Sequence, residues 1–362
     1  MLKTRGKSVN LFLLNIHSRN PAYIMLTQRY SSVPCAELLS QDSTLVVMPL
    51  SGRCERTEPG LIYTGIDSCP KHSEPPENSE SPEHSEPPEH SPPLNELWQV
   101  EGPVVRGRSE HCDWSKNADV MCVARWLDES ECDDIEASTR RAYLSIMSVL
   151  KAHGFAHLFR CWNYLPSINE GEGDEEVYKR FCAGRLAAFE ALGIAPSQFP
   201  AASALGHHGR GAVIYVFASH SAPQHFKNIK QVNAYEYPRQ YGIGSPSFAR
   251  ATALSLASMG GGESSTHLFI SGTASIVGHE TVSVGDVQGQ LHVTGDNIAH
   301  LLAHANPDNK RLSALKVYVR HQAHVSEVEQ WLNKQYAGVD RVITLADVCR
   351  SDLLVEIECV CQ

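Results

Sequence analysis

The sequence has no long apolar segment. It contains 362 residues, of which 42% are hydrophobic and 20% charged. Its longest apolar runs, such as Leu11–Leu14, are far shorter than the roughly 18 residues of a membrane-spanning helix. This excludes a helical membrane protein, and the length allows one large globular domain or two modest ones with an ample core.

Positive charge is also scarce. The chain carries 31 Lys and Arg against 41 Asp and Glu, which gives a net charge of -10 at pH 7. Six of the glutamates lie in residues 72–93, so the remainder is close to neutral. A nucleic-acid binder obtains its affinity from concentrated positive charge, and we therefore expect no nucleic-acid partner.

No acidic residue precedes Glu37, although lysines and arginines are frequent there. Such a composition is typical of an organellar targeting segment. An incorrectly assigned start, with Met25 as the true initiator, explains it equally well, and we favour that interpretation.

The eleven cysteines are odd in number and show no CxxC spacing. A reduced, cytoplasmic chain is the simplest interpretation. No zinc-ligand pattern joins these cysteines to the histidines, so we predict no metal site.

The common catalytic signatures are missing as well. GxSxG, HExxH, the P-loop and a GxGxxG between strand and helix do not occur. The glycines at 260–262 lie between predicted strands, which favours a flexible connection over a phosphate-binding loop. An enzyme of this kind would work without a cofactor, through acid/base and cationic side chains.

A proline-rich acidic segment divides the chain. It reads HSEPPENSESPEHSEPPEHSPP, contains HSEPPE twice and has almost nothing apolar to bury. We interpret it as a solvated linker. A docking tail is an alternative, but we favour a tolerated expansion at the surface. The predicted parts are an N-terminal segment 1–71, the linker 72–95, a first half 96–230 and a catalytic second half 231–362.

Strand and helix patterns alternate after the linker, and their order is similar in both halves. This predicts a duplicated α+β architecture. The predicted strands are 120–127, 155–165, 213–218, 231–237, 249–256, 267–271, 315–320 and 353–360, and the predicted helices are 134–153, 175–192, 296–304 and 325–336.

The last strand, LLVEIECV, places Glu356 and Glu358 on one face, about 7 Å apart. A solvated edge is the ordinary interpretation of such a face. Apolar neighbours on that face instead favour desolvation, which would raise a carboxyl pKa and leave a general acid. Glu356, deeper in the strand, is the better candidate.

Arginines and tyrosines form a second group of candidates, with Arg160, Arg250 and Arg320 inside apolar runs. Each needs an anionic partner, which is either an internal carboxylate or the carboxylate of a substrate. The small residues of SGTASIVGH, from Ser271, similarly indicate either a tight β connection or the wall of a ligand site.

Six sequence blocks in the same order resemble the chorismatases. The resemblance spans Trp98 to the C-terminus and implies two fused RidA/YjgF-like (chorismate mutase-like) halves. The blocks are WNYLPSIN (162–169), YxxFxxGRxxAF (178–189), PAASALG (200–206), YEYPRQYGxxSPSFARA (235–251), FISGTASIVGH (269–279) and CRSDLLVEIE (349–358).

The resemblance implies cleavage of chorismate to pyruvate and 3-hydroxybenzoate, with 4-hydroxybenzoate left open as an additional product. Glu356 would protonate the enolpyruvyl methylene, and water or a ring hydroxyl would attack the resulting cation. Cys349 resembles the cysteine of the hydroxybenzoate-forming branch; a buried small hydrophobe is its ordinary interpretation. The implied substrate contacts are Arg160, Tyr235, Tyr241, Arg250, Gly272, Thr273, Ala274, Arg320 and Arg341.

Two other functions remain open from the sequence. A RidA-like enamine or imine deaminase would also use an arginine and Glu356, and a non-catalytic metabolite-binding module is possible on the same fold. We expect chorismate as partner, and a monomer or a RidA-like trimer. Hydroxybenzoates serve ubiquinone, pigment and polyketide biosynthesis, and the sequence does not choose among these routes.

Overall fold

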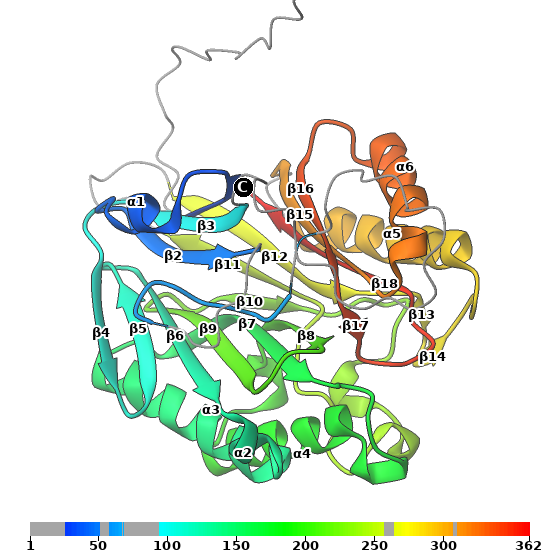
Figure 1. The fold of residues 1–362 in the computed structure, drawn as a ribbon, viewed down its shortest axis with the longest axis horizontal. Helices are drawn as coiled ribbons and strands as arrows, with labels where there is room; N and C mark the ends of the chain where they lie inside the picture. The colour runs from blue at the N-terminus through cyan, green and yellow to red at the C-terminus, as the bar shows by residue number, and fades with distance from the viewer. Residues whose placement is uncertain (1–25, 51–57, 67, 69–93, 257–263, 307–309) are drawn as a thin grey trace, which may run out of the picture.

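Three larger β-sheets pack against one another in the part of the chain that the computed structural model describes, residues 26–50, 58–66, 68, 94–256, 264–306 and 310–362 (Figure 1). The first sheet has the strand order β1-β3-β2. Helix α1 (Cys35–Leu39) connects two of its strands. These strands are β1 (Leu26–Ser31), β2 (Thr44–Pro49) and β3 (Asn95–Val100).

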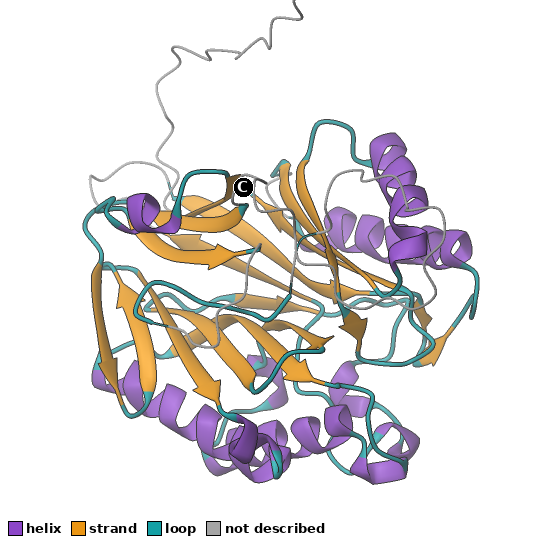
Figure 2. Ribbon diagram, viewed as in Figure 1, coloured by secondary structure: helices purple, strands orange, loops and turns teal. Residues whose placement is uncertain are grey.

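The second sheet has the order β17-β8-β7-β9-β6-β5-β4. Helices α3 (Ile135–Ala152) and α4 (Val177–Ala191) cover its outer face, and the short α2 (Glu129–Cys132) precedes them (Figure 2). The strands are β4 (Val105–Ser109), β5 (Cys112–Lys116), β6 (Val120–Leu127), β7 (His157–Pro166), β8 (Ala201–His207), β9 (Ala212–Ser219) and β17 (Asp347–Val348).

The third sheet has the order β10-β11-β12-β18-β15-β16. Its outer face packs against α5 (Val287–Ala305) and α6 (Val325–Gln335). The strands are β10 (Gln224–Phe226), β11 (Ala251–Leu256), β12 (Ser265–Thr273), β15 (Leu312–Val319), β16 (Asp340–Leu345) and β18 (Val355–Cys361), and a small hairpin of β13 (Ile276–Val277) and β14 (Glu280–Thr281) lies beside it.

The second and third sheets repeat one topology. In each, two antiparallel strands lead to a helix, a central strand, a second helix, a strand parallel to the central one and a final strand. Strand β7 pairs in parallel with β8 and antiparallel with β9, and β15 pairs in the same way with β16 and β18. The predicted α+β class and its duplication are therefore confirmed.

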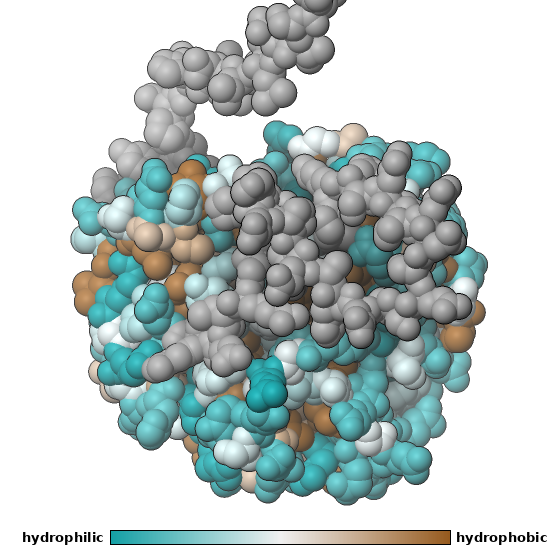
Figure 3. Space-filling view, viewed as in Figure 1, coloured by the Kyte–Doolittle hydropathy of each residue, from teal (hydrophilic) through white to brown (hydrophobic). Residues whose placement is uncertain are grey.

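The three sheets share one apolar core. Trp98 of the first sheet, Trp162 of the second and Phe269 of the third belong to the same buried cluster. The interior also contains a buried ion pair. Lys316 Nζ lies 2.7 Å from Glu96 Oε2, and both side chains are fully buried. On the surface shown in Figure 3, hydrophobic groups are scattered among hydrophilic ones.

Local sequence explains the helix pair on the second sheet. Asp134 caps α3 by accepting a hydrogen bond from the N–H of Ala137, and the cap residue at the other end is His153. Gly184 lets α4 approach α3 closely, since a Cβ there would lie 2.1 Å from the backbone oxygen of Glu136. The GRxxAF block is thus partly a packing motif.

Two predictions of secondary structure need correction. Residues 231–237 form no strand; Gln231 makes an isolated bridge to Gly278, and a 3-10 helix follows at Ala234–Glu236. Their strand-like pattern reflects packing of Tyr235 on Phe199, with ring centroids 5.8 Å apart.

The predicted helix 296–304 is too short, because α5 already begins at Val287. Gly289 and Gly295 lower the helix propensity of its first half. Gly295 is needed there, since a Cβ would lie 2.8 Å from the Trp331 ring. Strand β8 was not predicted, because its sequence AASALGH is poor in β-branched residues.

The predicted linker falls largely in residues 69–93, outside the described residues, as do Met25 and residues 260–262. The proposed domain boundaries therefore stay a prediction. Strand pairing places β3 with the N-terminal strand β1, and β10 with β11 of the second half. No helix of the described residues is long and apolar enough to cross a membrane.

Candidate active site

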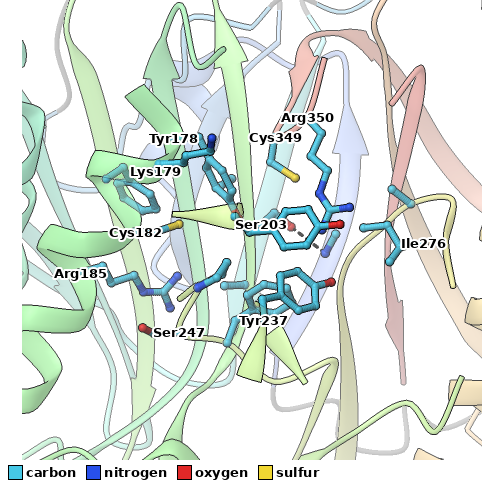
Figure 4. Close-up of a pocket in the computed structure, with 18 of the residues that line it drawn as sticks. Tyr178, Lys179, Cys182, Arg185, Ser203, Tyr237, Ser247, Ile276, Cys349 and Arg350 are labelled. Atoms are coloured by element: carbon cyan, nitrogen blue, oxygen red, sulfur yellow. Dashed lines mark hydrogen bonds between the residues drawn. The ribbon is translucent and has the colours of Figure 1, made fainter. Parts of the chain in front are cut away.

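A cavity of about 240 Å³ lies between β8 of the second sheet and β12 of the third (Figure 4). The duplicated halves therefore meet at this site. Helix α4, residues 237–248 and the turn before β18 complete its wall.

Glu356 on β18 lines the cavity and is only 4% exposed. Burial raises its pKa to about 8, with a further upward contribution from the charge of Glu358 and downward contributions from Arg160 and Arg250. The carboxyl therefore carries a proton at neutral pH and can act as a general acid.

Glu358, two residues farther along β18, is equally buried, but its carboxylate is hydrogen-bonded to side chains of the second sheet. It accepts hydrogen bonds from Arg160 (2.6 Å), the indole N–H of Trp162 (2.9 Å) and the hydroxyl of Ser203 (2.6 Å). Arg160 does not line the cavity. The anionic partner of Arg160 is thus an internal carboxylate, Glu358, and not the carboxylate of a substrate.

Two buried arginines on the cavity wall have unused donors. Arg185 is 3% exposed, and its Nε and one terminal nitrogen have no hydrogen-bond partner. The Nε of Arg250 also has none, while its terminal nitrogen donates to Tyr237 (2.7 Å). Because unpaired buried guanidinium donors are costly, this arrangement suits an anionic ligand.

A third arginine, Arg350, lies between two tyrosine rings of the wall. Its guanidinium carbon is 4.1 Å from the ring centroid of Tyr241 and 5.3 Å from that of Tyr237. It also donates to the backbone oxygen of His279 (2.9 Å). Figure 4 shows Arg350 and Arg185 entering from opposite sides of the cavity.

Gly272 and Ala274 form the wall next to the acid. A Cβ at Gly272 would lie 1.9 Å from Glu356 Oε1, so any larger residue there would displace the carboxyl. Thr273 does not line the cavity; its hydroxyl donates to the backbone oxygen of Ser271 (2.8 Å).

Cys349 lines the cavity beside Tyr178 and Glu356. Burial, and secondly the charge of Glu356, raise the pKa of Cys349 to about 12. The group present at neutral pH is therefore a thiol, not a thiolate nucleophile.

Three further predicted contacts lie elsewhere. Arg320 is paired with Asp347 and donates to several backbone oxygens. Arg341 contacts Asn333, and Tyr235 packs on Phe199. Each therefore has a structural partner and none lines the cavity.

The structure brings together Glu356, Cys349, Tyr241, Arg250, Gly272 and Ala274 from the predicted set. It adds side chains that the sequence did not single out: Tyr178, Arg185, Ser203, Tyr237 and Arg350. All five lie inside the quoted motif blocks, and Arg350 directly follows Cys349. Among the described residues, no group of three or more His, Cys, Asp or Glu could hold a metal ion.

A protonated carboxyl that shares a cavity with arginines retaining unpaired donors suits acid catalysis on a small anionic substrate. Residues 96–218 match the family model "Chorismatase FkbO/Hyg5-like, N-terminal". A 3-hydroxybenzoate synthase from Streptomyces hygroscopicus is 37% identical over 281 residues, covering 74% of this chain and 81% of the relative. A chorismatase from Streptomyces rapamycinicus is 37% identical over 275 residues, covering 73% and 80%.

A chorismatase crystal structure superposes with a TM-score of 0.78 and 26% identity, covering 93% of this chain and 98% of that one. This chain belongs to the chorismatase family.

Proposed function

We propose that this protein cleaves chorismate to pyruvate and 3-hydroxybenzoate. The observation that carries the proposal is the buried Glu356 carboxyl, whose pKa is raised to about 8, in a cavity with the unpaired donors of Arg185 and Arg250. The names of the relatives support the same substrate and product.

Chorismate carries two carboxylates, and the two buried arginines can each bind one. Arg185 is held against the rings of Tyr143 and Phe189, with its guanidinium carbon 5.2 Å from each centroid. Such stacking fixes the direction of the free N–H groups. The substrate would therefore bind in one orientation, with its enolpyruvyl group toward Glu356.

Glu356 would transfer its proton to the enolpyruvyl methylene and leave a cation at the ether carbon. Attack by water would give a hemiketal that breaks down to pyruvate and a ring diol. Attack by the neighbouring ring hydroxyl would give a cyclic ketal and return a proton to Glu356. The bond between that oxygen and the ring then breaks, the oxygen becomes the keto oxygen of pyruvate, and loss of the proton from the ether-bearing ring carbon leaves 3-hydroxybenzoate. One well-placed acid typically accelerates such a step about 10² to 10⁴-fold. The atoms of chorismate equal those of 3-hydroxybenzoate plus pyruvate, so this product consumes no water, whereas a diol product consumes one molecule.

Cys349 is proposed to direct the outcome toward the aromatic product, with Ala274 shaping the adjacent wall. Its raised pKa excludes a thiolate role at neutral pH, so it would act as a neutral thiol in contact with the ring. A cytoplasmic location, a monomeric or trimeric state and the downstream pathway stay predictions.

The test is direct. Purified full-length protein is incubated with chorismate, pyruvate is followed enzymatically, and the aromatic products are separated by chromatography. Equal amounts of pyruvate and 3-hydroxybenzoate are expected. A correctly folded protein that releases no pyruvate would exclude the proposal.

A further inference from the structure

A second carboxyl group lies close to the proposed acid. Glu356 and Glu358 occupy alternate positions of β18 and share one face, about 7 Å apart along the strand. Glu358 does not line the cavity, so it has no contact with a bound substrate. The mechanism above gives it no task.

Glu358 is nevertheless held by three hydrogen bonds. Its three donors, Arg160, Trp162 and Ser203, all belong to β7 and β8 of the other half, and none is more than 3% exposed. One of the three hydrogen bonds comes from a guanidinium group, and such charge-assisted bonds are stronger than neutral ones. The fold thus fixes a negative charge beside the acid.

Ser203 also connects this carboxylate to the wall against which Glu356 lies. Its hydroxyl donates to Glu358 (2.6 Å) and accepts the backbone N–H of Gly272 (3.0 Å). Gly272 in turn lies against Glu356 Oε1. The position of the acid is therefore coupled to Glu358 through two intervening residues, Ser203 and Gly272.

We propose that Glu358 is a positioning residue, which keeps the Glu356 carboxyl protonated and holds the adjacent backbone in place. This inference rests on the proposed role of Glu356 as proton donor. Ser203 links Glu358 to the backbone beside Glu356 through hydrogen bonds, and the charge of Glu358 acts on the Glu356 carboxyl electrostatically.

The charges around Glu356 show why such a residue is needed. Arg160 on β7 and Arg250 before β11 both favour the ionised form of Glu356. Arg185 and Arg350 also line the cavity. Without Glu358, these cations would act unopposed and would lower the pKa of Glu356, so the group would lose its proton near neutral pH.

The test compares opposite charge changes in the full-length protein. We expect Glu358→Gln to move the alkaline limb of the kcat-pH profile to lower pH by about one unit, and Arg160→Met to move it to higher pH. Ser203→Ala changes no charge; it should leave the limb in place but lower kcat about tenfold. Arg210→Gln removes an exposed guanidinium that lies 3.4 Å from Glu129 and serves as the control.

Two outcomes overturn the inference. In the first, the alkaline limbs of the Glu358→Gln and Arg160→Met variants do not move in opposite directions. In the second, the Ser203→Ala variant has an unchanged kcat. Since breaking a buried ion pair can prevent folding, the Glu358→Gln/Arg160→Met double variant supplies a second test. It should show a limb within about half a unit of the wild type and a lowered kcat; an unchanged kcat contradicts the positioning role.

A titration without substrate separates this inference from the proposed function. The carboxyl carbon of Glu356 is followed by ¹³C NMR in ligand-free wild-type and Glu358→Gln protein. A lower midpoint in the variant supports the coupling even if chorismate is not turned over. Equal midpoints reject it even if pyruvate is released.

Discussion

The position of the Glu356 carboxyl depends on the absence of a side chain at Gly272, because a Cβ at position 272 would lie 1.9 Å from Oε1 of the glutamate. The Gly272→Ala substitution must therefore displace the carboxyl. We expect kcat to fall at least about 100-fold, while the thermal midpoint changes by only a few degrees. Steady-state kinetics and calorimetry check this. A Gly272→Ala variant with wild-type kcat would show that the position of Glu356 is unimportant.

Glu356→Gln should lower kcat about 10² to 10⁴-fold and leave KM nearly unchanged. In the wild type, activity depends on the protonated form. The rate should therefore be maintained below the pKa of about 8 and decline as the pH rises through that value. The measurement is kcat from pH 6 to 10. A rate that increases through pH 8 would instead identify a base.

Arg185→Met should raise KM for chorismate at least about 30-fold, because the buried cation supplies unpaired donors to the cavity. Arg180→Met is the matched control, since Arg180 lies on the same helix and pairs with exposed acids. Its KM should remain at the wild-type value. Equal KM values for both variants would remove Arg185 from the binding site.

Cys349→Ala should shift the products from 3-hydroxybenzoate toward the non-aromatic diol, with pyruvate release retained. Cys182→Ala is a suitable control, because Cys182 also lines the cavity but belongs to α4. Chromatography of both reactions gives the ratios. The proposed role of Cys349 is wrong if its variant and the control give the same mixture.

Lys316→Met should lower the free energy of unfolding by about 3 to 5 kcal/mol. It leaves Glu96 buried without its ion partner, which lies 2.7 Å away in the wild type. The Glu96→Gln/Lys316→Met double variant should recover part of this loss. Urea unfolding measures both, and a double variant less stable than the single one would contradict the explanation.

The acid could be predicted from sequence because a strand alternates its side chains. That periodicity alone places Glu356 and Glu358 on one face with apolar neighbours. It could not distinguish their environments. Glu358 faces Arg160 and Trp162 of the other half, whereas Glu356 faces the cavity, and this difference exists only once the halves have packed.

The arginines show the same division. The sequence predicted that arginines in apolar runs need anionic partners, which holds for Arg160 and Arg320, but it could not assign those partners. Arg160 and Arg320 are satisfied by Glu358 and Asp347, while Arg185 and Arg250 keep free donors. A helix sequence does not reveal which side chain projects toward another sheet.

By itself, the sequence determined the α+β class, the four longer helices at least in part, seven of the described strands and the family motifs, and it proposed Glu356 as the acid, since these follow from local periodicity and residue order. Tertiary structure alone decided which cations face the cavity, why position 272 is glycine and how strongly Glu356 holds its proton. Those properties depend on distances and burial between segments far apart in the chain.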